Sequence, residues 1–494
     1  MATAESSHDE PVPSAEEPNN KPEWLIDIVK EQQELLTVKT EKQVDEKPTR
    51  PMTRIQKVNK TLVRESNKAC FDPLVVSFGP FHHGKEGLMG MEPRKNVAAA
   101  WFISVATGKT GERANTITPK ETIDVYQKFK KAVTFSPRDC YADHEFFHKP
   151  KFPTESEDLM PMMFLDGCFI LHFIHLLVKG SSDDLWKSSH DLNQPHIVRD
   201  MFLLENQIPY PILSALMSIL PDKEIPKAWI MEFIFTFFLP PFEFNFSVVG
   251  CWRVLFLIFE NFISPIREYH LLGIWEGLYD KGSEPVHLLD LLQAVLVGGG
   301  ASPNSSHGSG YWNYYFRPIT ELKATGIHVS RGNFWMLKDV KFKRHPINSH
   351  LVLPQLVVDD STETRLLNLL AYEKCSDGPL NRTVTSYVCF LDTLIHNTED
   401  VKELQCKKIL LNRLGSNEKV DELFKNLATN LSPDYNVYID VINVRLSASR
   451  LQRLRASRDQ CHDLSLAEDL RSRKQLTLEG HLVKSYKAPS NLVK

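Results

Sequence analysis

The feature that most constrains the fold is an aromatic-rich apolar stretch, 229-WIMEFIFTFFLPPFEFNFSVVGCWRVLFLIFENFI-263. A stretch with so many apolar side chains must be buried, either in a membrane or in a protein core. Charged residues and prolines interrupt it at Glu232, Pro240, Pro241, Glu243, Arg253 and Glu260. No uncharged run therefore approaches the roughly 18 residues that a transmembrane helix needs. The stretch predicts two buried core helices separated at Pro240–Pro241.

The composition supports a large core. The chain has 494 residues, of which 42% are hydrophobic and 24% charged. This length suits about three domains, or one large domain with appendages. The net charge of -4 excludes a globally basic nucleic-acid binder, so we expect no nucleic-acid partner. The eight cysteines contain no C-x-x-C pair, which favours buried, reduced thiols over a disulfide scaffold.

The two ends of the chain differ from its middle. Residues 1–22 are polar and acidic, which predicts a disordered arm without a secretory signal. Residues 23–36 predict an amphipathic helix, followed by a polar linker to residue 53. Residues 432–494 form a basic tail, in which 441–494 carry 11 Lys and Arg against 5 Asp and Glu, giving +6. We expect an intracellular or peripheral membrane location.

Five arginines stand close together in the tail, at positions 445, 450, 453, 455 and 458. The simplest interpretation of this pattern is a helix face that is exposed to solvent and has no binding role. The functional interpretation is a contact with an anionic membrane surface or an acidic partner.

Between residues 54 and 431 the chain alternates apolar helical segments with short turns, which predicts a mainly α fold: a large helical domain with a minor antiparallel β element. The segment 416–427 is a clear helix with Ser416 as its cap. Gly415 is expected to close a preceding helix at 400–414.

Strand-like patterns are few. Residues 326–330 alternate, and so do residues 351–358 around Pro354, which favours an edge strand. The segment 298-GGGASPNSSHGSG-310 is rich in Gly and Ser and predicts a mobile loop inside the helical domain.

One short motif matches a metalloprotease pattern. The sequence 144-HEFFH-148 has the H-E-x-x-H spacing, so that on a helix His144 and His148 could bind zinc and Glu145 could polarise a water. Lys149 and Pro150 follow directly, however, and the helix should end there. A surface or loop cluster is therefore the default interpretation.

No other motif supplies catalytic chemistry. The 107-TGKTG-111 segment has Ile103 where a phosphate-binding loop needs a glycine. His82 and His83 are adjacent, so on an extended chain their rings point to opposite sides, and a role in a turn is favoured. Cys168 lies in an apolar run and is expected to be a core thiol. We expect no enzyme activity and no cofactor.

A set of longer motifs resembles a plant family built on the domain of unknown function numbered 247. Ten blocks occur in the order of the family and cover about residues 54–430. They lie at 73–84, 91–95, 138–141, 162–171, 200–213, 287–292, 320–327, 366–373, 384–395 and 409–427.

These blocks have a structural interpretation. In 203-LLENQIP-209 we expect a helix that ends before Pro209, and in 76-VSFGPFHHG-84 a strand that enters a Gly-Pro turn. In 162–171 we expect a core helix with a close backbone approach at Asp166-Gly167. The motif residues to which we assign structural roles are Gly79, Pro80, His82, His83, Asp166, Gly167, Glu205, Asn206, Gln207 and Pro209.

The resemblance also implies a kind of function. Family members usually end in one hydrophobic membrane-spanning helix, and the resemblance implies the plasma membrane as their location. This chain, by contrast, becomes basic and polar from about Tyr438. It also has Asn59 where the family usually has Pro. Some grass members resemble self-incompatibility determinants, which implies recognition. We therefore expect a non-enzymatic recognition or signalling protein with an unidentified protein partner.

Two alternatives remain open. The first is a peripheral membrane protein held by residues 441–494. The second is a zinc-dependent hydrolase that uses His144, Glu145 and His148.

Overall fold

In the computed structural model, all described residues belong to one compact unit within Thr53–Lys494. They are residues 54–143, 147, 159–180, 193–221, 225–240, 271–279, 283–298, 317–332, 335–343, 349–375, 378, 382–434 and 438. The predicted acidic arm and the helix at 23–36 lie outside these residues. So do the H-E-x-x-H motif except Phe147, the Gly/Ser loop except Gly298, and the basic tail except residues 432–434 and Tyr438.

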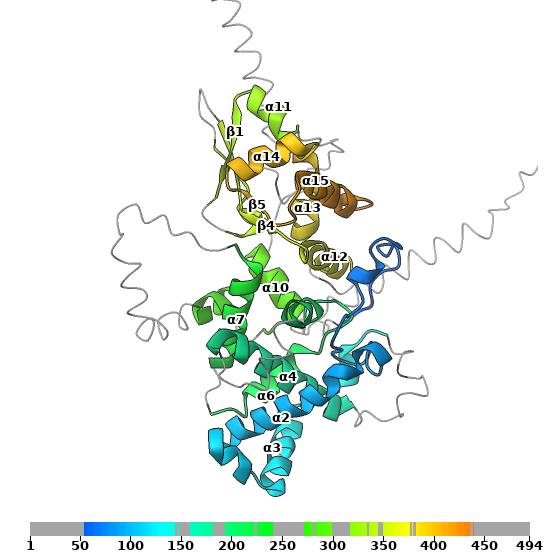
Figure 1. Cartoon of the computed structure of the whole chain (residues 1–494), viewed down its shortest axis with the longest axis vertical. Coiled ribbons are helices and arrows are strands. Elements are labelled where there is room, and N and C mark those ends of the chain that lie inside the picture. Colours follow the sequence, from blue (N-terminus) through cyan, green and yellow to red (C-terminus); the bar gives the residue numbers. More distant parts are fainter. Residues whose placement is uncertain are drawn as a thin grey trace, which may run out of the picture. The chain divides into compact units, whose positions relative to one another are not determined.

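The described part of the chain is mainly helical with a minor β component, as the sequence predicted (Figure 1). The α-helices are α2 (Glu92–Thr107), α3 (Pro119–Ala132), α4 (Leu159–Lys179), α6 (Tyr210–Met217), α7 (Ile225–Phe238), α10 (Leu288–Val297), α11 (Ile319–Ala324), α12 (Thr362–Glu373), α13 (Thr383–Leu394), α14 (Thr398–Cys406) and α15 (Asn417–Ala428). Short 3-10 turns include η1 (Lys68–Cys70), η2 (Glu86–Met91), η3 (Gly111–Thr116), η4 (Pro137–Cys140) and η7 (Leu337–Asp339).

Helix α4 is the centre of one part of the core. Its sequence is apolar on nearly every face, so it is stable only where other elements surround it. It packs against α2, α3, α6 and α7 (Figure 1). Among the described residues it is the one helix whose length and apolar composition would allow it to cross a membrane, and 67% of its most apolar window is buried inside the protein.

Gly167 explains how closely α4 approaches α6. A Cβ atom at this position would overlap the side chain of Leu216, and Ile212 and Ile208 lie just beyond. The close approach predicted at Asp166-Gly167 was expected to be to another backbone, whereas the neighbours of Gly167 are apolar side chains, and that of Leu216 belongs to α6.

Two small sheets accompany the helices. The first has the order β1-β3-β2, from β1 (Ile327–Arg331), β2 (Lys341–Lys343) and β3 (Ser349–Leu353), with β1 parallel and β2 antiparallel to β3. The second pairs β4 (Leu356–Val358) in parallel with β5 (Leu410–Asn412). The minor β element is thus mixed, not purely antiparallel.

Some element boundaries differ from the sequence predictions. The helix expected at 400–414 ends at Cys406, and β5 follows, because Leu410 and its neighbours pair with strand β4. Pro354 lies in neither strand. It separates β3, the central strand of the first sheet, from β4, an edge strand of the two-stranded sheet. The helix expected at 416–427 is confirmed as α15, with the Ser416 hydroxyl accepting from the Lys419 N–H.

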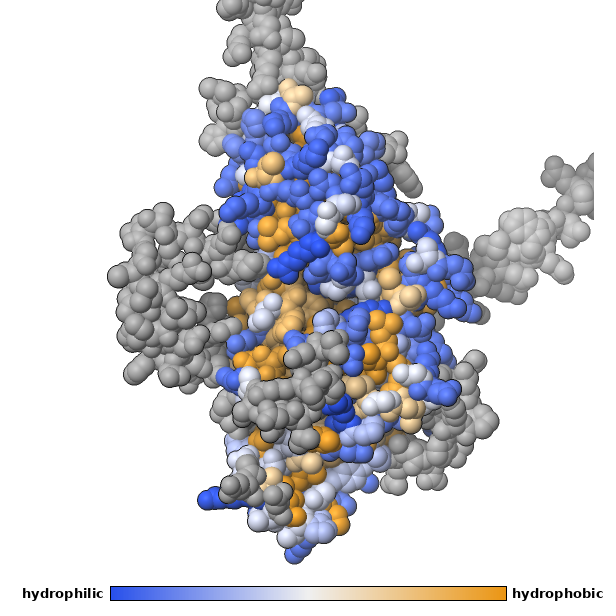
Figure 2. Space-filling view, viewed as in Figure 1, coloured by the Kyte–Doolittle hydropathy of each residue, from blue (hydrophilic) through white to orange (hydrophobic). Residues whose placement is uncertain are grey.

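The first predicted core helix in 229–263 is confirmed by α7, while residues 241–263 lie outside the described part. The expectation of buried thiols holds for Cys140 and Cys168, whereas Cys406 is exposed. On the surface drawn in Figure 2, the region over α11, α14 and α15 is predominantly hydrophilic. The exposed large hydrophobic residues among the described ones are Leu74, Met89, Val97 and Ile123.

Buried carboxylates join elements that are distant in sequence. Glu373, at the end of α12, is 3% exposed and accepts hydrogen bonds from the backbone N–H groups of Val384 and Thr385 at the start of α13. The Thr385 hydroxyl and the Gln293 amide of α10 donate to the same carboxylate. A helix N-terminus favours an anion, so Glu373 caps α13 from another helix.

Glu373→Ala is expected to lower the free energy of unfolding by about 2–4 kcal/mol, because it leaves buried N–H donors without an acceptor. Urea unfolding followed by circular dichroism measures the change. The control is Glu321→Ala, an acidic residue whose side chain is 57% exposed and 3.8 Å from Arg317. A surface pair of this kind contributes little, so the control should change stability by less than about 0.5 kcal/mol. Equal losses in the two variants would contradict the capping role.

Candidate functional site

The predicted motif residues gather around one irregular stretch, residues 74–79, which we call the cradled segment. It lies between η1 and η2 and forms no β-strand. Its backbone groups are bonded mainly by side chains from α2, α4 and the 199–207 region. The sequence prediction of a strand at this position was therefore wrong, because side chains take the place of a neighbouring strand.

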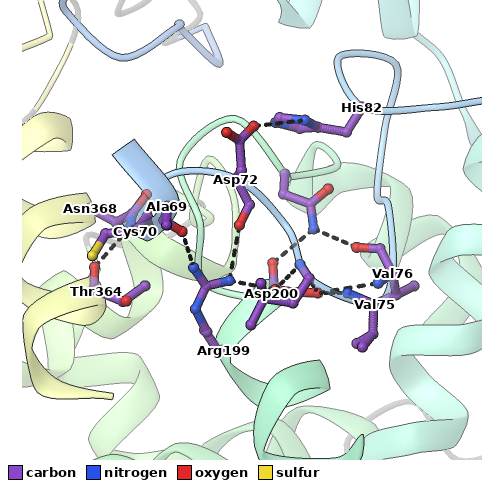
Figure 3. Close-up of polar contacts among 12 residues, drawn as sticks. Ala69, Cys70, Asp72, Val75, Val76, His82, Arg199, Asp200, Thr364 and Asn368 are labelled. Carbon is purple, nitrogen blue, oxygen red and sulfur yellow. Dashed lines mark hydrogen bonds and ion pairs between the residues drawn. The ribbon is translucent and has the colours of Figure 1, made fainter. Parts of the chain in front are cut away.

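Asp200 holds the first half of the cradled segment (Figure 3). Its carboxylate accepts from three consecutive backbone N–H groups, those of Leu74, Val75 and Val76, at 2.8–3.1 Å. Arg199 donates to the same carboxylate at 2.8 Å, and also to the carbonyl oxygens of Ala69 and Asp72. Burial raises the pKa of Asp200, and the three N–H donors oppose that shift.

Asn206 holds the middle of the cradled segment. Its side-chain oxygen accepts from the Phe78 N–H at 2.8 Å. Its amide nitrogen donates to the carbonyls of Val76 and Asp200, at 3.0 and 2.9 Å. Asn206 is 1% exposed, so all three bonds form away from water and are costly to lose.

A buried ion cluster holds the other end. Lys95 of α2 is 1% exposed, and its Nζ lies 2.7 Å from Asp166 Oδ1, 2.7 Å from Glu92 Oε1 and 2.7 Å from the Ser77 carbonyl. The second Asp166 oxygen accepts from the Gly79 N–H at 2.8 Å. Burial alone would lower the pKa of Lys95, but the two carboxylates outweigh it and raise the pKa, so the side chain is a cation.

The backbone of the 203–209 loop closes over Gly79. The Tyr141 hydroxyl donates to the Gln207 carbonyl at 3.0 Å. The Gln207 side chain donates to the carbonyls of Met201 and Leu203, which folds the loop tightly. Gly79 has φ +66°, and a Cβ atom there would lie 2.5 Å from the Gln207 carbonyl oxygen. Only glycine fits this position.

The 203–209 segment is therefore not the helix that the sequence predicted. The helical residues 193–200 end at Asp200, and Pro209 is the N-cap residue of α6. The backbone leaves the helical path because Glu205, Asn206 and Gln207 bond to segments elsewhere in the chain. Glu205 accepts from the Val58 N–H at 2.8 Å, Asn206 from the Phe78 N–H at 2.8 Å and Gln207 from the Leu289 N–H at 3.4 Å.

His82 lies at the charged rim of this site. Its side chain is 5% exposed, with Nδ1 3.9 Å from Asp72 Oδ1 and Nε2 4.0 Å from Glu205 Oε2, beyond hydrogen-bonding distance. Burial lowers the pKa of His82 to about 4, and the Lys85 ammonium adds to that shift while Asp72 opposes it. The imidazole is therefore neutral near pH 7, and neither ring nitrogen has a hydrogen-bond partner among the described residues.

The other predicted residues are placed as follows. Pro80 is buried beside Gly79, whereas His83 is half-buried, so the two adjacent histidines do differ in exposure. His144, Glu145 and His148 lie outside the described residues. Among the residues that the structure describes, no group of three His, Cys, Asp or Glu side chains is placed to hold a metal ion.

Several residues of the site were not among the predicted ones. These are Glu92, Lys95, Tyr141, Arg199 and Asp200. Four of them lie inside the motif blocks 91–95, 138–141 and 200–213. The sequence did contain a signal for these residues, namely a charged or phenolic side chain next to apolar positions expected to be buried. Because a buried charge needs a partner, such a side chain indicates a polar contact inside the core.

The chemistry of the site is that of a scaffold. Its carboxylates and amides bind the N–H and C=O groups of the cradled segment, and its lysine neutralises two acids. No Ser, Thr or Cys among the described residues hydrogen-bonds to the His82 imidazole.

Gly79→Ala is expected to lower the free energy of unfolding by about 3 kcal/mol or more, because the residue has positive φ and the added methyl group meets backbone. Urea unfolding measures it. Gly90→Ala is the matched control, since a Cβ at Gly90 meets nothing within 4 Å, and it should stay within about 0.5 kcal/mol. A tolerated Gly79→Ala would show that the loop does not close as described.

Stability is expected to fall as the pH is lowered from 6.5 to 4. In this window the unfolded chain protonates His82 while the folded chain does not, so the unfolded state binds more protons. The loss attributable to His82 is about 3 kcal/mol at pH 4. Urea unfolding of the native protein and of His82→Gln between pH 8 and 4 tests this. The variant should show the smaller decrease, and parallel curves would refute the assignment.

Comparison with known proteins identifies the same family as the motif blocks. A family model described as a plant protein of unknown function, domain of unknown function 247, matches residues 55–460. A UPF0481 protein of Arabidopsis thaliana is 27% identical over 369 residues, covering 73% of this chain and 70% of the relative. A putative UPF0481 protein of the same plant is 22% identical over 440 residues, covering 74% and 76%.

No solved structure matches the chain. The family match covers most of the chain and includes every block on which the resemblance rested. The chain therefore belongs to the plant family defined by domain of unknown function 247.

Proposed function

We propose that this chain is a non-enzymatic recognition or signalling protein that acts through protein partners. The observation that supports this is the use of the motif residues. Asp166, Asn206 and Gln207 bond to the backbone of the chain itself, and Gly79 is fixed by close packing. The motif that marks the family therefore builds a rigid body, and rigid bodies with variable loops are suited to recognition.

The family to which the chain belongs also supports this proposal. Some of its grass members resemble self-incompatibility determinants, which suggests recognition of another protein. Membrane association through the basic residues 441–494 is the second candidate, supported by their charge of +6 (11 basic against 5 acidic residues).

The test is proximity labelling in plant tissue with the full chain, followed by binding measurements with the purified candidate partners. We expect at least one candidate to form a one-to-one complex with a micromolar or lower Kd, and the purified chain to hold less than about a tenth of an equivalent of zinc.

Two results would overturn the proposal. The first is stoichiometric zinc with hydrolase turnover, both lost in a folded His148→Ala variant. The second is that no purified candidate binds, while the chain floats with phosphatidylserine-containing vesicles only when residues 441–494 are present. That result would replace protein recognition with membrane binding.

A further inference from the structure

A cleft of about 400 Å³ lies between the 64–67 segment, the start of α12 and one face of α15. Four leucines form its apolar part, namely Leu367, Leu414, Leu423 and Leu427. Three of them are almost fully buried and Leu414 is partly buried. The cleft is thus able to receive an apolar side chain.

Its remaining lining is charged and mostly acidic. The carboxylates are those of Asp359, Asp360, Glu363 and Glu422, and the cations are those of Arg64 and Lys419. Arg64 is already engaged, because its guanidinium donates to the carbonyls of Asn426 and Thr429 at the end of α15. The lining has a net charge of -2 (two cations against four carboxylates).

Three of the four carboxylates are available. Asp359 is engaged with the Ser361 and Thr362 hydroxyls. Asp360, Glu363 and Glu422, by contrast, form no ion pair with another described residue. A ligand for this cleft should therefore carry positive charge together with a compact apolar group.

The chain itself contains such a segment. Residues 445-RLSASRLQRLRASR-458 hold five arginines, three leucines and no acidic residue. The arginines match the carboxylates of the cleft, and the leucines match its apolar part.

The segment is also within reach. Tyr438 is 5% exposed, its hydroxyl donates to the Leu337 carbonyl at 2.9 Å, and its ring is 5.3 Å from that of Phe390 in α13. Helix α13 packs against α15, which lines the cleft, and packed helices are about 8–10 Å apart. Arg445 follows Tyr438 by seven residues, a reach of roughly 25 Å for an extended chain.

We propose that residues 445–458 dock in this acidic, leucine-lined cleft of their own chain. A tethered segment acts at an effective concentration in the millimolar range, so weak individual contacts suffice. While it is docked, the tail covers the cleft and its arginines are withheld from other anionic surfaces. The proposal does not depend on the proposed function.

The experiment places a photo-crosslinking amino acid, p-benzoylphenylalanine, at Ser66 of the full chain, since Ser66 lines the cleft and is exposed. After irradiation, the crosslinked peptides are identified by mass spectrometry from a mixture of isotope-labelled and unlabelled protein. We expect a crosslink to residues 445–458 within a single chain. The same probe at exposed Glu399 on α14, outside the cleft lining, should give none.

A matched pair of charge variants tests the chemistry of the contact. Glu363→Gln with Glu422→Gln should lower the crosslink yield about fivefold, because two of the acidic contacts are lost. Glu399→Gln with Glu418→Gln removes the same charge from exposed positions outside the cleft lining and should leave the yield unchanged. Circular dichroism confirms that both variants are folded.

Three results would overturn the proposal. They are the absence of a crosslink to 445–458, a crosslink only between labelled and unlabelled chains, and an equal yield in the two charge variants. The second of these would assign the cleft to the tail of another copy.

Discussion

The structure depends on buried carboxylate and amide side chains that bind backbone N–H groups of distant segments. Asp200 takes three consecutive N–H groups of the cradled segment, Asn206 a fourth and Asp166 a fifth. Glu373 does the same for the start of α13. Asp400 likewise accepts from the N–H groups of Thr320, His396 and Asn397. A buried N–H without an acceptor destabilises the folded state. Each of these carboxylates supplies the missing acceptors, so that an irregular segment can be buried in the core.

This arrangement explains why the motif blocks are long, because each polar side chain needs a particular backbone segment opposite it. Gly79 must be glycine because the 203–209 loop lies against it, and that loop keeps its path because of Gln207.

The mainly helical class, the core position of 162–171 and the helix with Ser416 as its cap could be predicted from periodicity and capping residues, which act locally. The loop at 203–209 could not, since its apolar and amide residues suit a helix and only contacts with remote segments decide otherwise. The end of the helix at Cys406 has the same cause, because residues 410–412 pair with a strand more than 50 residues earlier. Of the residues in the site, the sequence indicated Asp166, Asn206 and Gln207. The ion pair between Lys95 and Asp166 could be recognised only from the folded structure.

The bonds between Asp200 and the cradled segment join residues 124–126 positions apart, and Arg64 reaches the end of α15 across 362–365 positions. On a ribosome, the residues of the cradled segment therefore emerge long before their acceptors exist. Until Asp200 and Asn206 have been synthesised, these backbone groups can form hydrogen bonds only with water or with non-native partners. Such non-local pairing slows folding. The first 200 residues of the chain are thus expected to need protection from aggregation during synthesis.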